Sequence, residues 1–422
     1  MPATTPAATQ TYADLFRRFG PGDRIYLAGA AGAPSAAFAA LEAEPDAARG
    51  LVFTGVWLPG VNDVDPTAAV PDASADVFFV GPGQREGFSA GRIRHLPLHY
   101  WDAERWLSGP ASLKAGAFAV SAPRDGHVTP GLSTDFDAAL LASGAALIGE
   151  INPDMPAPPG APRIPVDRFA ALIEPDAPAP LPTFETGDVP QDLAAIAAGI
   201  AERLRPGDCL QIGIGKAAAA VLDALQGAKG LRYHAGLVID AMIPHLDAGT
   251  FSEGITTGTA LGTAPLYDRV AAEAAIDWRP VRRTHAFATI AAIPGFKAVN
   301  SALEIDLFGQ SNGETLRGRQ ISGSGGSVDF QRGARASEGG EAILALPATA
   351  GGGKVSRIKP RLEPVSIASI QRADADVVVT EHGAAELRWK SVDARAEALI
   401  AIAAPEFRDG LQDAWDAMRR AM

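Results

Sequence analysis

A glycine-containing sequence, IGIGKA, joins an apolar segment to an alanine-rich one at residues 212–217. The apolar residues 210–212 are typical of a strand, and the alanines that follow are typical of a helix. Backbone amides at such a turn, together with the positive end of the helix, attract phosphate or carboxylate groups. The pattern therefore predicts an anion site. A glycine turn that serves packing alone is an equal alternative, since the motif is neither GxGxxG nor a Walker loop.

Two further glycine-rich segments are candidates for close contact with a ligand. ISGSGGSVDF, residues 321–330, is too rich in glycine for the interior of a helix or strand, so we expect a ligand or another backbone beside it. ATAGGGKVSRI, residues 348–358, sets Lys354 and Arg357 beside a glycine run, where they can meet phosphate oxygens. The alternatives are a mobile surface loop for the first segment and solvated surface charge for the second.

Other catalytic patterns are missing from the sequence. There is no HExxH, and no pair of histidines sits with a carboxylate at metal spacing, so we predict no metal site. His234, in LRYHAGLVID, is isolated, and such histidines are more often hydrogen-bonded core residues than catalysts. Cys209 is the single cysteine, which excludes an intramolecular disulfide and favours a reducing compartment.

Composition excludes several classes of function. The formal charge is −12, from 37 basic and 49 acidic residues, and no basic run offsets it, so a nucleic acid is a poor partner. The start, MPATTPAATQTYADLF, lacks a signal-peptide pattern, and no apolar run has the length of a membrane span. We expect a soluble cytoplasmic protein. Hydrophobic residues at 47%, with 45 glycines and 33 prolines, indicate a globular, loop-rich enzyme.

The elements that must position these turns occur twice. FGPGDRIYLAGAAGAPSAAFAAL, residues 19–41, is similar to LRPGDCLQIGIGKAAAAVLDAL, residues 204–225. Each copy predicts a helix ended by Pro-Gly, a short strand (25–27; 210–212), a Gly/Ala turn and a second helix, which is the βα half of a parallel unit. With the Pro-rich connection 174–185, this predicts an α/β protein of two duplicated open domains, 1–180 and 181–422.

Further segments extend this interpretation. Apolar runs at 147–151, 342–346 and 377–381 suit buried strands of such sheets, and the last forty residues are expected to be helical.

Five blocks in order along the chain resemble the acetyl-CoA hydrolase/transferase family, the class I CoA-transferases that include 4-hydroxybutyrate, butyrate and succinyl-CoA:acetate CoA-transferases. The blocks are LQIGIGKAAAAVLDAL, VNSALEIDLFGQSN, GSGGSVDFQRGA, VVVTEHGAAELRWKS and RAEALIAIAAPEFRDGL, and GEINPDMP in the first half is similar too. The resemblance implies two CoA-transferase-like α/β domains that act on an acyl-CoA thioester, bound mainly by the second domain. A small carboxylic acid would be the partner substrate, no cofactor would be permanently bound, and a homodimer is the default for soluble enzymes.

The resemblance also assigns roles to individual residues. It places CoA contacts at two glycine-rich turns and one lysine, namely Gly213, Ile214, Gly215, Lys216, Ala217, Ser322, Gly325, Gly326 and Lys354. Asn300 matches an asparagine that helps to position the reacting carboxylate, and His234 is a second possible helper. The amide of Gly326 would lie near the oxyanion, where one preformed donor contributes on the order of 3 kcal/mol.

One position departs from the family pattern. In these transferases a glutamate in a His-Ser/Thr-Glu triplet attacks the acyl-CoA, and here the triplet is His234-Ala235-Gly236. A glycine cannot carry the covalent intermediate. Glu253 lies in another predicted segment, and Glu304 and Glu381 match glutamates that we interpret as structural.

Several activities are compatible with this departure. The first hypothesis is hydrolysis by a water molecule in the room vacated at Gly236. The alternatives are CoA transfer by another carboxylate or directly between bound partners, a CoA-ester-binding regulator without turnover and, on fold analogy alone, a sugar-phosphate isomerase-like activity. The sequence does not indicate which acyl group is used.

Overall fold

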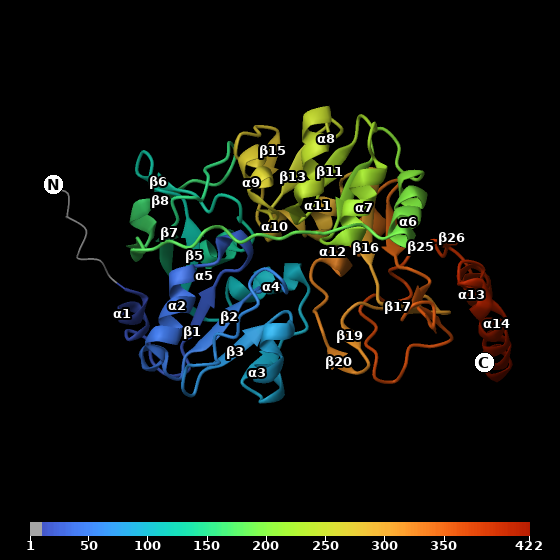
Figure 1. Ribbon diagram of the computed structural model, residues 1–422, viewed down its shortest axis with the longest axis horizontal. Helices are drawn as coiled ribbons and strands as arrows, with labels where there is room; N and C mark the ends of the chain where they lie inside the picture. Colours follow the sequence, from blue (N-terminus) through green and yellow to red (C-terminus); the bar gives the residue numbers. More distant parts are fainter. Residues whose placement is uncertain (1–10) are drawn as a thin grey trace. The chain divides into compact units, whose positions relative to one another are not determined.

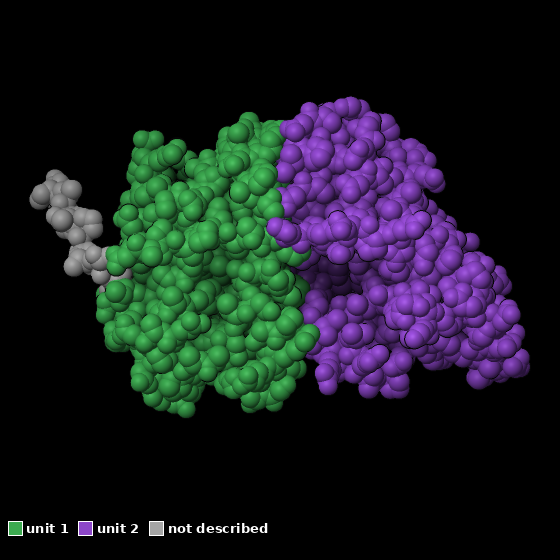
Figure 2. Space-filling view, in the orientation of Figure 1, with its two compact units in different colours: residues 1–98, 102–184, 258–282 green, residues 99–101, 185–257, 283–422 purple. Residues whose placement is uncertain are grey.

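The computed structural model describes residues 11–422, which form two compact units (Figures 1 and 2). The first unit takes the chain up to residue 98, then 102–184 and 258–282, and the second takes 99–101, 185–257 and 283–422. The chain thus passes to the second unit after Phe184, at the end of the Pro-rich connection. The division into domains 1–180 and 181–422 stays a prediction. The signal-peptide prediction concerns the chain start, and residues 1–10 lie outside the described part.

The first unit is built on a parallel sheet with the strand order β4-β3-β2-β1-β5-β7-β9. Its strands are β1 (Arg24–Leu27), β2 (Val52–Gly55), β3 (Ser74–Val77), β4 (Ile93–His95), β5 (Leu113–Val120), β7 (Ala146–Ile151) and β9 (Ala171–Ile173), and shorter ones are β6 (His127–Val128), β8 (Ile164–Pro165), β14 (Thr259–Ala260) and β15 (Ile276–Trp278). Its helices are α1 (Tyr12–Phe16), α2 (Ser35–Ala43), α3 (Arg85–Ser89), α5 (Asp137–Ser143) and α9 (Ala264–Ala271), while α4 (Tyr100–Leu107) and α10 (Val281–Thr284) contain residues of both units.

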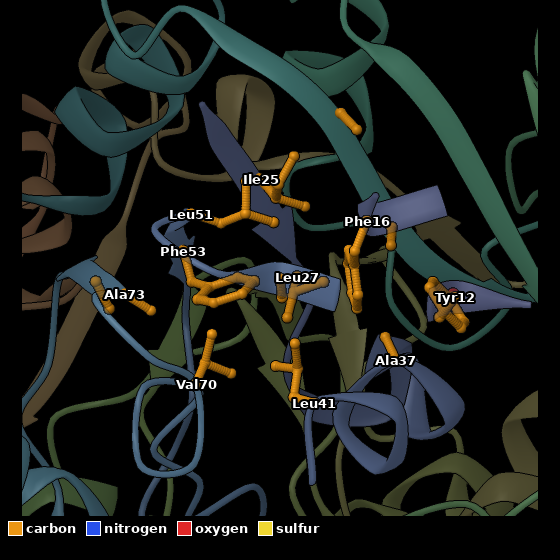
Figure 3. Packing of buried hydrophobic residues seen from close by; sticks show 14 of the residues in the cluster. Tyr12, Phe16, Ile25, Leu27, Ala37, Leu41, Leu51, Phe53, Val70 and Ala73 are labelled. Carbon is orange, nitrogen blue, oxygen red and sulfur yellow. The ribbon is translucent and has the colours of Figure 1, made fainter. Parts of the chain in front are cut away.

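The core of the first unit explains why nearly all consecutive residues of these strands are apolar. Phe16 of α1, Leu41 of α2 and Phe53 of β2 pack around Ile25 and Leu27 of β1 (Figure 3). A parallel sheet covered on both faces buries successive side chains on both sides, so alternation with polar residues disappears.

The second unit repeats this arrangement. Its sheet contains, in order, β13 (Ile255–Thr257), β11 (Arg232–His234), β10 (Cys209–Ile212), β16 (Phe296–Ser301), β21 (Glu341–Ala345), β25 (Val377–Thr380) and the antiparallel β26 (Gly383–Glu386). Its helices are α6 (Gln191–Ala201), α7 (Lys216–Ala224), α8 (Ile243–Ala248), α11 (Phe287–Ala291), α12 (Ser327–Ala336), α13 (Val392–Ala401) and α14 (Pro405–Ala421). Short strands complete it: β12 (Leu237–Val238), β17 (Glu304–Asp306), β18 (Ser311–Asn312), β19 (Thr315–Leu316), β20 (Arg319–Gln320), β22 (Thr349–Ala350), β23 (Val355–Ser356) and β24 (Ile358–Lys359).

In both sheets, the first strand of the repeated sequence lies at the position where the strand order reverses. Strand β1 lies between β2 and β5, and β10 lies between β11 and β16. Ligands of open α/β sheets bind outside the carboxyl ends of the strands at this switch point. The predicted α/β fold with parallel sheets is confirmed, and each strand predicted above overlaps an observed one. Within residues 11–422, no helix has the length and apolar character needed to cross a membrane.

A group of buried acids lies near the switch point of the first sheet. Asp135 and Asp137 line a small cavity together with Tyr26 and Ala28, and Glu104 interacts electrostatically with both acids. Burial raises the pKa of Glu104 to about 7 and that of Asp137 to about 8. Nε of Arg282 donates to Oε1 of Glu104 at 2.8 Å, but Oε2 of Glu104 and Oδ1 of Asp137 are buried without a hydrogen-bond partner. Ionisation of these side chains in the folded protein costs free energy, because buried carboxylates lose their hydration.

Candidate active site

A cavity of about 250 Å³ in the second unit lies at the carboxyl ends of β10 and β16. Its walls bring together the two glycine-rich turns that the sequence singled out, since Gly213, Ile214 and Ala217 line it on one side and Ser322 on the other. It is rich in hydroxyl groups, which come from Ser301, Ser311, Ser322, Ser324, Ser327 and Ser369. Small polar side chains leave room for a ligand and offer it hydrogen bonds.

The first turn contains two glycines with different roles. Strand β10 is buried throughout, and Gly215, the N-cap of α7, has φ 89° and ψ −167°, a conformation that only glycine adopts readily. At Gly213, by contrast, an added Cβ would meet no heavy atom within 4 Å. Gly213 is therefore not required for packing, and its missing side chain leaves the cavity open.

The second turn leads into α12. Gly325 has a positive φ of 53°, and Gly326 is the N-cap of the helix. Oγ of Ser327 donates to the carbonyl oxygen of Ser324 at 2.8 Å, and both residues line the cavity. Thus α7, with nine residues, and α12, with ten, both begin at this cavity. Helix N-termini carry partial positive charge, so the cavity favours an anion or a developing oxyanion.

Several predicted site residues do not line this cavity: Gly215, Lys216, Gly325, Gly326, Lys354, Asn300 and His234. Asn300 is buried on β16, and its Nδ2 donates to Oε1 of Gln211 at 3.0 Å. Lys354 is exposed in the turn between β22 and β23. The CoA-binding, positioning and oxyanion roles that the resemblance gave to these residues stay predictions.

The space beside Gly236 is filled, which differs from the expectation of a vacated room. A Cβ on Gly236 would lie 3.0 Å from Cε1 and 3.3 Å from Nε2 of His285. A Cβ on Gly326 would overlap Cδ2 and Nε2 of the same ring. The imidazole of His285 therefore packs against two glycines that belong to different segments. A water molecule cannot occupy the place where the ring lies.

His285 is held by its neighbours on several sides. Its ring stacks on Tyr100 with centroids 5.0 Å apart and contacts Phe330 of α12 at 4.5 Å. Its Nδ1 is 2.8 Å from Oγ1 of Thr284. Burial, together with the electrostatic effect of His234, lowers the pKa of His285 to about 3, so the imidazole is neutral at ordinary pH.

Sequence reasoning also missed a segment from the first half of the chain. Residues 99–101 belong to the second unit: Nδ1 of His99 is 2.8 Å from Oγ of Ser324, and the amide of Tyr100 donates to the carbonyl oxygen of Gly325 at 3.1 Å. The amide of Trp101 donates to Oδ2 of Asp329 at 3.1 Å. Nothing in the local sequence indicated this role for residues 99–101, because their contacts to the turn join residues more than 200 positions apart.

Glu314 is a further lining residue that the sequence did not single out. It is 6% exposed and supplies the only carboxylate in the lining of the cavity described here. Asn312 fixes the local chain, because its Oδ1 accepts from the amides of Glu314 and Thr315, both at 3.0 Å. Nε2 of Gln320 donates to Oε2 of Glu314 at 3.4 Å, so the carboxylate has one protein partner in the cavity wall. No cluster of three potential metal-binding His, Cys, Asp or Glu side chains occurs within residues 11–422.

Comparison with known proteins gives this site a context. The family model described as the acetyl-CoA hydrolase/transferase C-terminal domain matches residues 262–415. The 4-hydroxybutyrate coenzyme A transferase of Clostridium kluyveri is 31% identical over 92% of this chain and 93% of that protein. Butyryl-CoA:acetate CoA-transferase of Anaerostipes caccae is 32% identical over 81% of each chain. Acetyl-CoA hydrolase of Candida albicans is 27% identical over 49% of this chain and 40% of that protein.

Solved structures show the same relationship. RipA from Yersinia pestis matches with a TM-score of 0.89 and 26% identity, over 98% of this chain and 97% of that one. A 4-hydroxybutyrate CoA-transferase from Porphyromonas gingivalis matches with a TM-score of 0.77 and 26% identity over the same shares. The chain belongs to the acetyl-CoA hydrolase/transferase family. The prediction of an enzyme of the acyl-CoA transferase or hydrolase class is confirmed at this level.

Proposed function

We propose that this protein hydrolyses acyl-CoA thioesters by direct attack of water, without a glutamyl intermediate. The observation that carries the proposal is the cavity at which α7 and α12 both begin, since it combines anion-attracting helix ends with the family's glycine-rich turns. Gly236 offers no nucleophile, and the imidazole of His285 fills the space beside it. The attacking water would then approach from the cavity.

The steps can be written with the residues available. Glu314, in the cavity wall, would accept a proton from water while the water oxygen bonds to the acyl carbon. The tetrahedral oxyanion would be stabilised by backbone amides at the start of α12. The C–S bond would then break, and the proton held by Glu314 would pass to the CoA thiolate. The products are a carboxylic acid and free CoA.

The decisive experiment measures free thiol released from a panel of short acyl-CoAs, with and without labelled acetate. We expect thiol release that is independent of acetate and falls about 10²–10⁴-fold in Glu314→Gln, the usual contribution of a general base. Label entering the thioester pool would instead show direct transfer to a carboxylic acid. Absence of turnover across the whole panel would contradict both activities.

A regulator that binds a CoA ester without turnover is the second candidate. It is favoured by the close contact at Gly236, because a Cβ there would already lie 3.0 Å from the His285 ring. Calorimetry with a nonhydrolysable thioether analogue measures binding, and the thiol assay with acyl-CoA measures turnover. Binding of the analogue without thiol release from acyl-CoA supports the regulator.

Cytoplasmic location and a homodimeric state are further proposals, testable by fractionation and by light scattering.

Gly213→Val is expected to impair acyl-CoA binding without reducing stability. The φ of Gly213 lies outside +20° to +160°, and a Cβ there would meet no heavy atom within 4 Å, so we expect the valine methyl groups to extend into the cavity. We expect Kd for CoA to rise about tenfold or more, which corresponds to about 1.4 kcal/mol. Gly410→Val is the matched control, since a Cβ at Gly410 in α14 also meets nothing within 4 Å. Unchanged affinity in Gly213→Val would show that CoA does not use this cavity.

A further inference from the structure

A large aromatic side chain lies on the surface of the second unit in a strained backbone conformation. Trp389, between β26 and α13, is 87% exposed and has a φ of 63°, in the left-handed region that bulky residues rarely adopt. The chain is held on both sides of it, since Leu387 is fully buried and Oγ of Ser391 caps α13 by accepting from the amide of Ala394 at 3.2 Å. The backbone therefore presents the indole to solvent, and tryptophan is enriched among the residues that dominate binding at protein interfaces.

Cationic side chains lie next to this indole. The guanidinium of Arg388 is 5.3 Å from the centroid of the Trp389 ring. Nη2 of Arg388 donates to the carbonyl oxygen of Arg335 at 2.8 Å, which connects Trp389 to further cations on α12 and α13. We call this surface the basic patch, and it consists of Trp389 with Arg335, Arg372, Arg388, Lys390 and Arg395.

The positive charges of the basic patch are crowded together. Asp376 offsets part of the charge, because its carboxylate oxygens lie 3.3 Å from Nη1 of Arg335 and 3.6 Å from Nη1 of Arg388. Nη1 of Arg395 donates to the carbonyl oxygen of Arg372. Burial, together with the positive charges of Arg335 and Arg372, lowers the pKa of Arg395. A cluster of like charges in a chain with a formal charge of −12 favours an acidic partner.

The outer face of α14 supplies a surface of the opposite charge. Leu411 and Trp415 turn one side of this helix toward the core. The opposite side carries exposed carboxylates three and four positions apart, which we call the acidic stripe: Glu406, Asp409, Asp413 and Asp416. Arg420 follows only in the last turn. Such a stripe alone is typical of a solvated helix face, and it is the basic patch that gives it a complementary surface.

We infer that two copies of this chain associate through a two-fold interface, in which the basic patch of one copy binds the acidic stripe of the other. Strand β26, α13 and α14 follow one another at one end of the second unit, and α14 packs on α13 (Figure 1). Both surfaces therefore lie at this end, and a two-fold axis forms each contact twice. Trp389 is buried at each contact and is surrounded by ion pairs. The inference gives the proposed homodimer a specific surface and does not depend on the proposed hydrolysis.

The test is reciprocal charge reversal, with the molar mass measured by light scattering over a concentration series. The patch variant is Arg372→Glu with Lys390→Glu, and the stripe variant is Asp409→Lys with Asp413→Lys. All four side chains are exposed, so both variants should fold. We expect the dissociation constant of the dimer to rise about 10²-fold or more in each, because like charges then face each other. An equimolar mixture of the two variants should regain the mass of a dimer, as should a chain with all four substitutions.

Two further variants separate the outcomes. Arg85→Glu with Lys114→Glu makes the same change in net charge at exposed positions of the first unit, so this control should remain a dimer. Trp389→Gly removes the indole where glycine is unstrained, so the dissociation constant should rise about tenfold or more without a fall in the melting temperature of the monomer.

Dimers in both reversed variants, or a mixture of the two that stays monomeric, would overturn the inference and leave the homodimer proposal intact. A monomeric unaltered protein would overturn the inference together with the proposed homodimer. The thiol-release assay decides the proposed hydrolysis separately in every case.

Discussion

Gly236→Glu alone is expected to show no CoA exchange between acids, whereas Gly236→Glu combined with His285→Ala should show it. A Cβ at position 236 already lies 3.0 Å from the His285 ring, and Tyr100 and Phe330 prevent that ring from moving away. Overpacking of this kind costs about 1–3 kcal/mol. Removal of the imidazole gives the carboxylate the space that the ring occupies, so the covalent glutamyl route that the resemblance implies becomes sterically possible.

The measurements are exchange of labelled acetate into acetyl-CoA and an increase in protein mass equal to covalently held CoA. Gly236→Gln with His285→Ala is the matched control, because its amide has the same shape but cannot form the intermediate. Equal exchange in the single and double glutamate variants would show that His285 does not block the position. A folded double variant without exchange would contradict the assignment of position 236 as the family's nucleophile.

Asp137→Asn is expected to stabilise the protein at alkaline pH. Asp137 is buried at the start of α5, and its Oδ1 has no hydrogen-bond partner. Glu104 and Asp135 add electrostatic repulsion, and the pKa of Asp137 is raised to about 8. Replacement by a neutral amide removes the free-energy cost of ionising this side chain. We expect a gain of about 1–3 kcal/mol, the usual penalty of a buried unsatisfied group.

The pH dependence has a definite sign. The folded pKa of about 8 lies above the unfolded value of about 3.9, so between these limits the native state holds a proton that the unfolded state lacks. The free energy of unfolding contributed by this group therefore falls as pH rises from about 4 to 8. The advantage of Asp137→Asn in melting temperature should be small at pH 5 and several degrees at pH 9. Glu42→Gln, at an exposed position of α2, is the control, and a larger advantage at pH 5 would contradict the prediction.

Local sequence was sufficient for the elements and for the turns between them. Strand β10 and its turn into α7 were predictable because consecutive apolar residues, then glycines, then alanines impose strand, turn and helix through short-range backbone preferences. The duplication placed the same unit at β1 and α2. Two of the predicted glycine-rich segments, at 212–217 and 321–330, do contribute to one cavity, because they lead into α7 and α12, which both begin there.

The amino-acid sequence by itself determined the α/β class, the family and the absence of a glutamate at position 236. Only the tertiary structure decided what occupies that position, because His285, Gly236, Gly326 and Tyr100 come from four separate segments. Contacts between residues so far apart depend on how strands are ordered in the sheet and how long connections return to it. Local preferences carry no information about that order, and this is why neither the His285 contact nor the placement of Glu314 in the cavity was predictable from the pattern of residues.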